Sequence, residues 1–582
     1  MTTTVEAPAA PSRPEPGPSA PGGAVDAGRA QAYGRWLAVS LAVAFLVRLV
    51  FALTDDAPST DETAYLRSGA AIWEGAGFTR EGSPELHFPP GLPFVVGGLG
   101  RLVDPHVAMV VLTLVAATLL VLPIATLARR AGGDRAGLAA AFTAALAPGL
   151  SALLVNRGGG SEAPYALLVL VALWLVVSAR DRSVRGRYAA AAGAAAATGA
   201  AYLVRPEGIF FTVVFVPVLA TTAIGGWRRL RTREPVPGGV RQALGLAAVF
   251  GAVLLVFVAP YVSYLHTETG RWELTAKTQD ASIEAWRAVA SGDRQSRDRV
   301  IYALDDTGFA FSASRSSLPQ LAREDPRGYL GILRTNLGEL PRNFLVPEVG
   351  SRWAWRLLPM PFVLVGLWGS WKYRRDRVIL AAAAVAALPL LTSLVFFVLP
   401  RYLVLPTALL CVPIGLAFAS LRGRWQVPVA VIGVAFMVAS LVPELRGPAG
   451  WFHPGELTDH RAAGEWIAQN VGPTDRIMTR SMVIEYYADR RAIAVPYATK
   501  SEILAFARHF GVRYLVADRY NANRLRPQLL SLFDDVPDKG LRLVREFDTE
   551  GRVTRLFALD PVPPQSEEPG PSLGFMGDGA AG

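Results

Sequence analysis

The sequence predicts a polytopic α-helical membrane protein with a small α/β domain near its C-terminal end. Hydrophobic residues make up 51% of the 582 residues and charged residues only 18%, a balance too apolar for an ordinary soluble protein of this size. Apolar runs long enough to cross a bilayer recur up to about residue 443. Beyond them the pattern changes to short, alternating helix and strand signals.

The segment 1–33 predicts a disordered tail on the cytoplasmic side of the membrane. It is rich in Pro, Ala and Gly and cannot bury enough apolar surface to fold. It lacks a basic start followed by a short apolar core and a cleavage site, so we expect no removable signal peptide. The first apolar helix is expected to stay as an anchor.

About eleven membrane-spanning helices are expected, because each span needs about 20 mostly apolar residues. Two of the eleven candidates are short. All eleven together form one transmembrane domain over 34–443. The candidate spans lie near 36–53, 107–128, 136–155, 164–179, 189–204, 208–226, 242–264, 356–371, 378–399, 402–420 and 427–443.

Five short basic segments lie between these spans, and all five fall on one side of the membrane if the N-terminus is inside. Because Lys and Arg accumulate in cytoplasmic loops, the N-terminus is expected in the cytoplasm. The formal charge of +10 is spread over these bursts rather than gathered on one face, so nucleic acid is not an expected partner. The basic segments are 128–135, 180–187, 227–235, 372–377 and 421–425.

The extracytoplasmic side is expected to carry two long loops, 54–106 and 265–355, and everything after residue 444. In that last segment "DHRAAGEWIAQNV" and "SEILAFARHF" have helical spacing, whereas "RIMTR" and "VRYLVAD" are typical of strands. We therefore expect an extracytoplasmic α/β domain over 444–560 and a disordered tail over 561–582. The single cysteine, Cys411, lies in an apolar run, so no disulfide framework is expected.

An acidic pair, Asp61 and Glu62, stands at the start of a predicted helix just beyond the first span. Ser59 or Thr60 can cap this helix, and acids in its first turn suit the helix dipole, so the pair has an ordinary structural explanation. Its place at the membrane surface suggests a second one. A carboxylate there can accept a proton from an acceptor hydroxyl or amine, or bind a cation.

Other acids and a histidine of the same loop have plainer explanations. Asp55 and Asp56 follow the first span directly and are expected to be solvated linker acids. His87 precedes "FPPG", and a lone loop histidine is more often structural than functional; it remains a candidate for substrate binding. The six histidines show no pair at metal-ligand spacing, and the sequence has neither a P-loop nor a GxSxG motif.

Three arginines lie at the outer ends of predicted spans, against the general preference of arginine for the cytoplasmic side. Each one alone is explained by snorkelling or by turn capping. Three together favour a phosphate site, since a guanidinium binds phosphate oxygens through paired donors. The three sites are Arg157 with Glu162 in "RGGGSE", Arg205 with Glu207 in "LVRPEG", and Arg401 with Tyr402 in "PRYLVLP".

These motifs, in this order, resemble the GT-C class of integral membrane glycosyltransferases, in the family that includes protein O-mannosyltransferases and the lipid A aminoarabinose transferase. The matching features are "TDETAY", "HFPPGLPFVVG", "SEAPYALLVLVALWL", "LVRPEG" and "PRYLVLP", followed by a C-terminal segment that resembles the family's extracytoplasmic domain. The resemblance covers about residues 36–550. Its specificity comes from the order of the motifs and the topology, because each motif is short.

The resemblance implies a transferase that moves a hexosyl or pentosyl group, with inversion, from a polyprenyl-phosphate-linked donor to an extracytoplasmic acceptor. Asp61 matches the family's candidate general base, with Glu62 beside it, and Arg401 would stabilise the departing phosphate. Arg205, Arg157 and Tyr402 are further candidates for donor-phosphate binding. Glu162, Glu207 and His87 are candidates for substrate binding. A divalent cation held by Asp61, Glu62 and Glu162 is an alternative use of these acids, and the loop 265–355 is expected to pack over the cavity.

Three other functions are compatible with parts of the sequence. A transporter or flippase of lipid-linked saccharides would show internal repeats and ionisable residues near the middle of spans, whereas here such residues gather at the outer ends, Arg48 excepted. An O-antigen-type polymerase would also use outer arginines, and the Asp61–Glu62 pair favours the transferase over it. A catalytically inactive scaffold is the third alternative.

Overall fold

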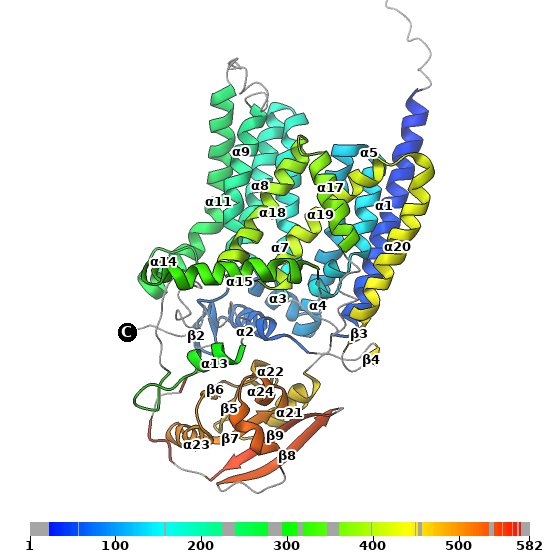
Figure 1. Ribbon diagram of the computed structural model, residues 1–582. Coiled ribbons are helices and arrows are strands. Elements are labelled where there is room, and N and C mark those ends of the chain that lie inside the picture. Colours follow the sequence, from blue (N-terminus) through cyan, green and yellow to red (C-terminus); the bar gives the residue numbers. More distant parts are fainter. Residues whose placement is uncertain are drawn as a thin grey trace, which may run out of the picture.

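The computed structural model consists of a helical bundle with a five-stranded α/β domain next to one end of it (Figure 1). We call this the domain-side end of the bundle and the other end the far end. The structure describes residues 22–55, 57–155, 159–223, 239–276, 294–311, 318–345, 360–396, 398–447, 450–451, 457–534, 540–549, 551–560, 563–566 and 570–571.

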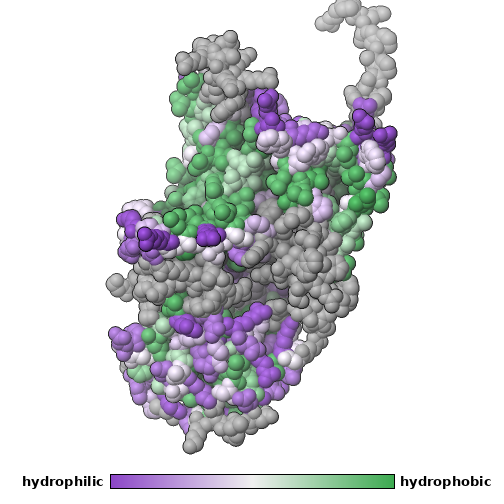
Figure 2. All heavy atoms as spheres, in the orientation of Figure 1, coloured by the Kyte–Doolittle hydropathy of each residue, from purple (hydrophilic) through white to green (hydrophobic). Residues whose placement is uncertain are grey.

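The bundle is built from long apolar helices whose facing sides carry small and aliphatic residues. Its surface is a broad apolar band, as Figure 2 shows by the green side chains over the bundle. The helices are α1 (Gly22–Ala52), α4 (Pro105–Leu119), α5 (Val121–Leu146), α7 (Glu162–Ser178), α8 (Val184–Val204), α9 (Thr212–Ala223), α11 (Gly239–Thr269), α17 (Met360–Lys372), α18 (Arg377–Val395), α19 (Val404–Ala419) and α20 (Gly423–Leu445).

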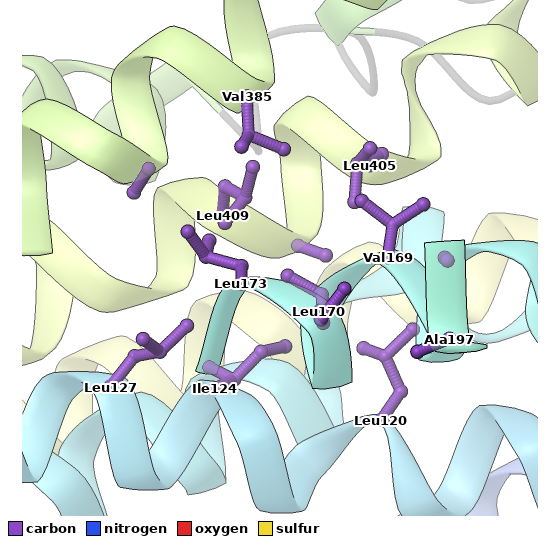
Figure 3. Close-up of a cluster of buried hydrophobic side chains, with 14 of the residues drawn as sticks. Leu120, Ile124, Leu127, Val169, Leu170, Leu173, Ala197, Val385, Leu405 and Leu409 are labelled. Atoms are coloured by element: carbon purple, nitrogen blue, oxygen red, sulfur yellow. The ribbon is translucent and has the colours of Figure 1, made fainter. Parts of the chain in front are cut away.

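The centre of the bundle is an apolar core shared by α5, α7, α8, α18 and α19 (Figure 3). Leucine and valine side chains fill it, and alanines of α8 let that helix approach closely. The side chains that meet there include Leu120, Ile124, Leu127, Val169, Leu170, Leu173, Ala197, Val385, Leu405 and Leu409.

Among the described residues, eight helices are long and apolar enough to cross a membrane. The predicted class, a polytopic α-helical membrane protein with a small α/β domain, is thus confirmed. The number differs from the expected eleven for identifiable reasons. The run Pro105–Leu146 counts once, although Gly133 has φ 79° and ψ −173° and breaks it. A Cβ on Gly137 would meet the Cβ of Arg129 at 2.8 Å, so the chain folds back on itself at Gly133.

Two further expected spans fall on helices that are less apolar or shorter. The predicted span 189–204 lies on α8, whose alanine and glycine content gives it weaker hydropathy. The predicted span 356–371 overlaps α17, which has 13 described residues. α1 begins at Gly22, inside the segment predicted as a tail, and residues 1–21 of that tail lie outside the described residues.

The basic segments of α5 and the turn after α7 meet at the far end of the bundle. There Arg130 pairs with Asp181, and Arg187 Nη2 donates to the carbonyl of Arg180 at 3.4 Å. Arg129 pairs with Asp134 at 2.7 Å across the turn at Gly133. The basic segment 227–235 lies outside the described residues.

At the domain-side end the segment 54–106 folds into α2 (Thr60–Glu74), a two-residue hairpin of β1 (Thr79–Arg80) and β2 (Ser83–Pro84), and the short apolar helix α3 (Gly91–Gly100). α2 and α3 cross closely at Gly69 of α2 and Gly97 of α3. A Cβ on Gly69 would lie only 2.5 Å from the carbonyl oxygen of Pro93, so a side chain there would prevent the close approach. α2 lies between the bundle and the α/β domain (Figure 1).

The long loop 265–355 is divided between the two parts of the molecule. Its helix α13 (Arg294–Ile301) and the following turn join the core of the α/β domain through Ile301, Tyr302 and Phe311. The amphipathic helix α15 (Pro326–Leu345) instead lies across the base of the bundle, after α14 (Leu318–Glu324) (Figure 1). The whole loop was expected to pack over the cavity, and its segment 277–293 lies outside the described residues.

The α/β domain contains one sheet with strand order β6-β5-β7-β9-β8, in which β6, β5 and β7 run parallel and β9 and β8 antiparallel. A two-residue hairpin, β3 (Arg446–Gly447) and β4 (Gly450–Trp451), precedes it. The other elements are α21 (Thr458–Asn470), β5 (Arg476–Thr479), α22 (Met482–Tyr487), β6 (Ala492–Ala494), α23 (Lys500–His509), β7 (Val512–Asp518), α24 (Arg519–Arg524), β8 (Leu541–Thr549) and β9 (Arg552–Leu559).

Part of the predicted C-terminal tail packs on this domain. The carbonyl of Pro571 accepts a hydrogen bond from the N–H of Ala494 in the edge strand β6 at 2.9 Å. The N–H of Gln565 donates to the carbonyl of His509 at 2.9 Å. The chain therefore covers an open sheet edge that would otherwise present unpaired backbone groups.

Candidate functional site

The first turn of α2 holds the acidic pair in place through a capping box. Ser59 Oγ accepts from the N–H of Glu62 at 3.5 Å, and the Glu62 carboxylate accepts from the N–H of Ser59 at 2.6 Å. Both partners satisfy backbone groups that a helix start leaves open. The Glu62 carboxylate is thus bound to the helix N-cap. The carboxylate of Asp61, one residue earlier, takes no part in this capping box.

Asp61 meets an arginine that is far away in the sequence. Its Oδ2 lies 2.5 Å from Nη1 of Arg401, which stands in the 3₁₀ turn η5 (Pro400–Leu403) before α19. Both side chains keep 28% of their surface exposed. The ion pair is therefore formed but remains accessible to a ligand.

A second ion pair lies directly beside the first. Glu162, at the start of α7, accepts from Arg205 Nη1 at 2.8 Å, and its Oε1 lies 4.0 Å from Nε of Arg401. Arg205 follows the last residue of α8 and also donates to Ser161 Oγ at 3.2 Å. Only 2% of the Glu162 side chain and 11% of that of Arg205 are exposed. This second ion pair is therefore the buried part of the site.

Aromatic rings fix the two guanidinium groups. The Tyr402 ring centroid lies 5.3 Å from Cζ of Arg205 and 5.4 Å from Cζ of Arg401, and Tyr165 of α7 stands 5.6 Å from Arg205. Arginine is attracted to ring faces at such distances. Glu207, in the turn η3 (Pro206–Phe211), lies 3.8 Å from Nε of Arg205. Tyr402 thus bridges the two ion pairs.

A glycine turn lets the carboxylates and arginines come this close. The N–H of Gly159 donates to Glu162 Oε2 at 2.9 Å. A Cβ on Gly159 would lie 2.8 Å from both Arg401 Nη1 and Asp61 Oδ2. A Cβ on Gly160, where φ is +78°, would lie 2.9 Å from Cγ of Glu62. Only residues without a side chain fit at these two positions.

The Glu62 carboxyl has a raised pKa. Burial, together with the charges of Glu162 and Asp61, raises the pKa of the Glu62 carboxyl to about 7, although the hydrogen bonds from Ser59 lower it. The ordinary value of a glutamate is near 4.3. At neutral pH Glu62 is therefore close to half protonated.

The structure brings together most of the residues predicted for the site: Asp61, Glu62, Glu162, Arg205, Glu207, Arg401 and Tyr402. Arg157 and Asp56 lie outside the described residues. The contacts of His87 place its ring on Phe88, with centroids 4.6 Å apart, while its N–H donates to Glu85 at 2.8 Å. Asp55 differs from the expected solvated acid, since its side chain is 6% exposed and lies 3.9 Å from His106 Nε2.

Sequence reasoning missed several residues that shape the site, namely Gly159, Gly160, Ser161 and Tyr165. The run of glycines in "RGGG" was too weak a signal for a phosphate-binding loop. Its actual meaning, close approach of two carboxylates and an arginine, depends on contacts with residues 61, 62 and 401. Such contacts leave no trace in the local sequence.

The three acids proposed as metal ligands do not fit a divalent cation in this arrangement. Asp61 and Glu162 each direct an oxygen to an arginine, and a cation there would meet both guanidinium charges. In the part of the chain that the structure describes, no group of three or more His, Cys, Asp or Glu side chains is arranged to hold a metal ion. No step is therefore assigned to a metal.

Chemically, the site places the accessible carboxylate of Asp61 beside the accessible guanidinium of Arg401. The carboxylate can accept a proton, and the guanidinium can stabilise an anion such as phosphate. The buried Glu162–Arg205 pair orients its neighbours Arg401 and Tyr402. Such a pair of groups suits a reaction in which an acceptor loses a proton while an anionic group leaves.

Comparison with known proteins shows a partial match to one family model and a shared fold. Residues 87–264 match the model of a family described as dolichyl-phosphate-mannose-protein mannosyltransferase. That segment includes Glu162 and Arg205. A comparison with curated protein sequences gives no match.

Several solved structures share the fold. The crystal structure of ArnT from Cupriavidus metallidurans bound to undecaprenyl phosphate matches with a TM-score of 0.53 at 16% identity, over 90% of this chain and 97% of that chain. The oligosaccharyltransferase of Archaeoglobus fulgidus in complex with Zn and sulfate matches with a TM-score of 0.54 at 15% identity, over 83% and 68%. The A. fulgidus oligosaccharyltransferase AglB in complex with an inhibitory peptide and a dolichol-phosphate matches with a TM-score of 0.50 at 13% identity, over 85% and 70%. The predicted resemblance to the GT-C class is thus confirmed at the level of the fold.

Proposed function

We propose that this chain is a glycosyltransferase that moves a sugar from a polyprenyl-phosphate-linked donor to an extracytoplasmic acceptor, with inversion. The observation that carries the proposal is the accessible Asp61–Arg401 pair at the domain-side end of the bundle, with the buried Glu162–Arg205 pair beside it. Support comes from ArnT and AglB, which share the fold and were solved with undecaprenyl phosphate and a dolichol-phosphate. In this proposal the domain-side end faces away from the cytoplasm.

The proposed transfer is a single displacement. The hydroxyl or amine of the acceptor bonds to C1 of the sugar while the bond between C1 and the phosphate oxygen breaks, and that electron pair stays on the phosphate. The acceptor's proton passes to the Asp61 carboxylate, which acts as general base. Arg401 binds the departing phosphate, which is a good leaving group and needs no general acid.

Binding of the donor changes the pairing seen in this structure. Arg401 Nη1 lies 2.5 Å from Asp61 Oδ2, so a bound phosphate and the carboxylate would share one guanidinium. A phosphate that takes over Arg401 releases an Asp61 oxygen for the acceptor proton. Arg205 adds positive charge beside Arg401 and keeps Glu162 oriented. It is itself held by Glu162, Ser161 and two tyrosine rings.

The proposal is tested by incubating the purified protein, with a cell-envelope extract as acceptor source, with three classes of donor. These are polyprenyl-phosphate hexoses and pentoses, polyprenyl-diphosphate oligosaccharides, and nucleotide sugars. We expect release of polyprenyl phosphate from the first class alone. Elongation of the diphosphate-linked oligosaccharides would instead favour a polymerase, and movement across vesicles with no bond cleavage would favour a flippase; either result contradicts the proposal.

Glu62→Gln should leave transfer within about threefold of the native rate below pH 7, because the glutamine carbonyl can still accept from the Ser59 N–H. Above about pH 7 the native Glu62 ionises, and its charge then repels the donor phosphate and Glu162. The native rate should therefore fall above that pH, whereas the rate of the glutamine variant should not. Rate measurements from pH 5 to 9 check this, and identical pH profiles would show that Glu62 does not titrate in the working enzyme.

Gly160→Ala should lower transfer about tenfold or more, since a methyl group would push Glu62 and the Gly160 backbone apart and would strain a residue with φ +78°. Gly149→Ala is the matched control. Gly149 lies in the 3₁₀ turn η1 (Pro148–Leu150), and its Cβ would have no heavy atom nearer than Thr407 Cγ2 at 3.8 Å. Equal rates for both alanine variants would show that the close approach at Gly160 has no role in transfer.

A further inference from the structure

The helix that carries Asp61 also contacts the α/β domain, and Arg67 forms hydrogen bonds across that contact. Arg67 lies six residues after Asp61 on α2, which places it about 9 Å further along the helix. Its Nη2 donates to the carbonyls of Tyr486 at 2.8 Å and Glu485 at 3.2 Å, and Nη1 lies 2.7 Å from Asp489 Oδ1. Its Nε forms an ion pair with Glu81 at 3.2 Å. None of these partners belongs to the site described above.

Two of the partners on the α/β domain are backbone carbonyls at the C-terminal end of α22, and the carbonyl of Tyr486 also accepts from the N–H of Asp489 at 3.2 Å. A helix leaves its last carbonyls without intrahelical partners, and a cation placed there satisfies them and suits the helix dipole. Arg67 does both across the boundary between the two parts of the molecule. The Tyr486 ring stands 5.4 Å from Cζ of Arg67 and packs against the apolar cluster of Ala64, Tyr65, Phe88 and Met109.

α22 is itself held firmly in the α/β domain. Val483 and Ile484 are fully buried, and the Glu485 carboxylate accepts from the N–H of Ala492 in strand β6 at 2.8 Å. Burial raises the pKa of Glu485 to about 8, so this carboxyl stays mostly protonated at neutral pH. The sheet, α22, Arg67 and the first turn of α2 thus form one connected path of packed groups that ends at Asp61.

We propose that Arg67 is a positioning residue for the transfer reaction: by holding α2 on the α/β domain it sets the position of Asp61 opposite Arg401. The inference rests on the proposed function. It gives the α/β domain a part in catalysis, because the contact fixes both the height and the rotation of the helix that carries the base. The described contacts of Arg67 are with residues outside the proposed donor site, so its loss should alter turnover rather than donor binding.

The test compares Arg67→Ala with the native protein and with Arg513→Ala. Arg513 forms a comparable ion pair, with Asp475 at 2.9 Å, but stands in the α/β domain away from α2. We expect Arg67→Ala to lower kcat about 10-fold to 100-fold, as for small displacements of a catalytic group. The KM for the donor should change less than about twofold, and Arg513→Ala should change neither. Asp489→Asn removes the charge of one exposed partner and suits the positive φ of 50° at this position. It should lower kcat in the same direction by less, which keeps the test valid if Arg67→Ala folds poorly.

A second measurement separates this inference from the proposed function. Hydrogen exchange of the α2 backbone, residues 60–74, should become faster in Arg67→Ala, whereas exchange in β5 and β7 should stay as in the native protein. If no donor is turned over, the proposed function fails, while the exchange data still decide whether Arg67 fixes α2. Unchanged exchange in α2, or faster exchange with an unchanged kcat, would overturn the positioning role.

Discussion

Replacing Asp61 with Asn is expected to lower kcat for sugar transfer about 100-fold to 10,000-fold, the range for loss of a general base. The amide cannot accept the acceptor's proton. It also no longer competes for Arg401, which lies 2.5 Å from the native carboxylate, so donor binding should be unchanged or tighter. The measurement is the release of polyprenyl phosphate under single-turnover conditions, together with donor affinity.

Asp475→Asn is the matched control for this variant. Asp475 also pairs with an arginine, Arg513, at 2.9 Å, but in the α/β domain. It should keep native kcat. A native rate in Asp61→Asn would show that another group takes the proton, and a parallel loss in both variants would point to a general effect on folding.

The second large effect is expected for Arg401→Ala, which should weaken binding of polyprenyl phosphate about 10-fold to 100-fold. A hydrogen bond to a charged group contributes about 1.5–3 kcal/mol, and the alanine variant also leaves Asp61 beside the phosphate without a counter-charge. Arg401→Lys should recover only part of the affinity, because an ammonium lacks the planar pair of donors. Binding of polyprenyl phosphate by native mass spectrometry checks this.

Arg374→Ala serves as the control for the loss of a positive charge. Arg374 follows α17 and donates to the carbonyl of Trp371 at 2.9 Å, in one of the basic segments between spans. Its replacement should leave the affinity unchanged. Native affinity in Arg401→Ala would remove Arg401 from the donor site, and full recovery with lysine would show that charge alone matters.

The membrane helices could be predicted from the sequence because the hydrocarbon core of a bilayer imposes its own length and composition on each span. The alternation of the α/β domain was also visible, since "RIMTR" and "VRYLVAD" became β5 and β7. The division of the loop 265–355 was not. It depends on the ion pairs of Asp298 with Arg480 at 2.8 Å and with Arg526. These arginines lie 182 and 228 positions after Asp298.

The general place of the site was predictable, but its pairing was not. Charged residues at the ends of apolar spans pointed to Asp61, Glu162, Arg205 and Arg401. Which arginine meets which acid depends on how the helices pack, and Arg401 and Asp61 stand 340 positions apart. The place of Glu62 in a first helical turn had an ordinary explanation in the helix dipole, whereas its raised pKa follows from burial that no local pattern shows.

The most direct measurement is the anomeric configuration of the transferred sugar, determined by NMR on the product formed from a donor of known configuration. A single displacement, with Asp61 taking the proton on the acceptor side and Arg401 holding the phosphate on the other, requires inversion at C1. We expect the product to have the opposite configuration to the donor. Retention would contradict this, because it would require a second displacement through a covalent sugar intermediate.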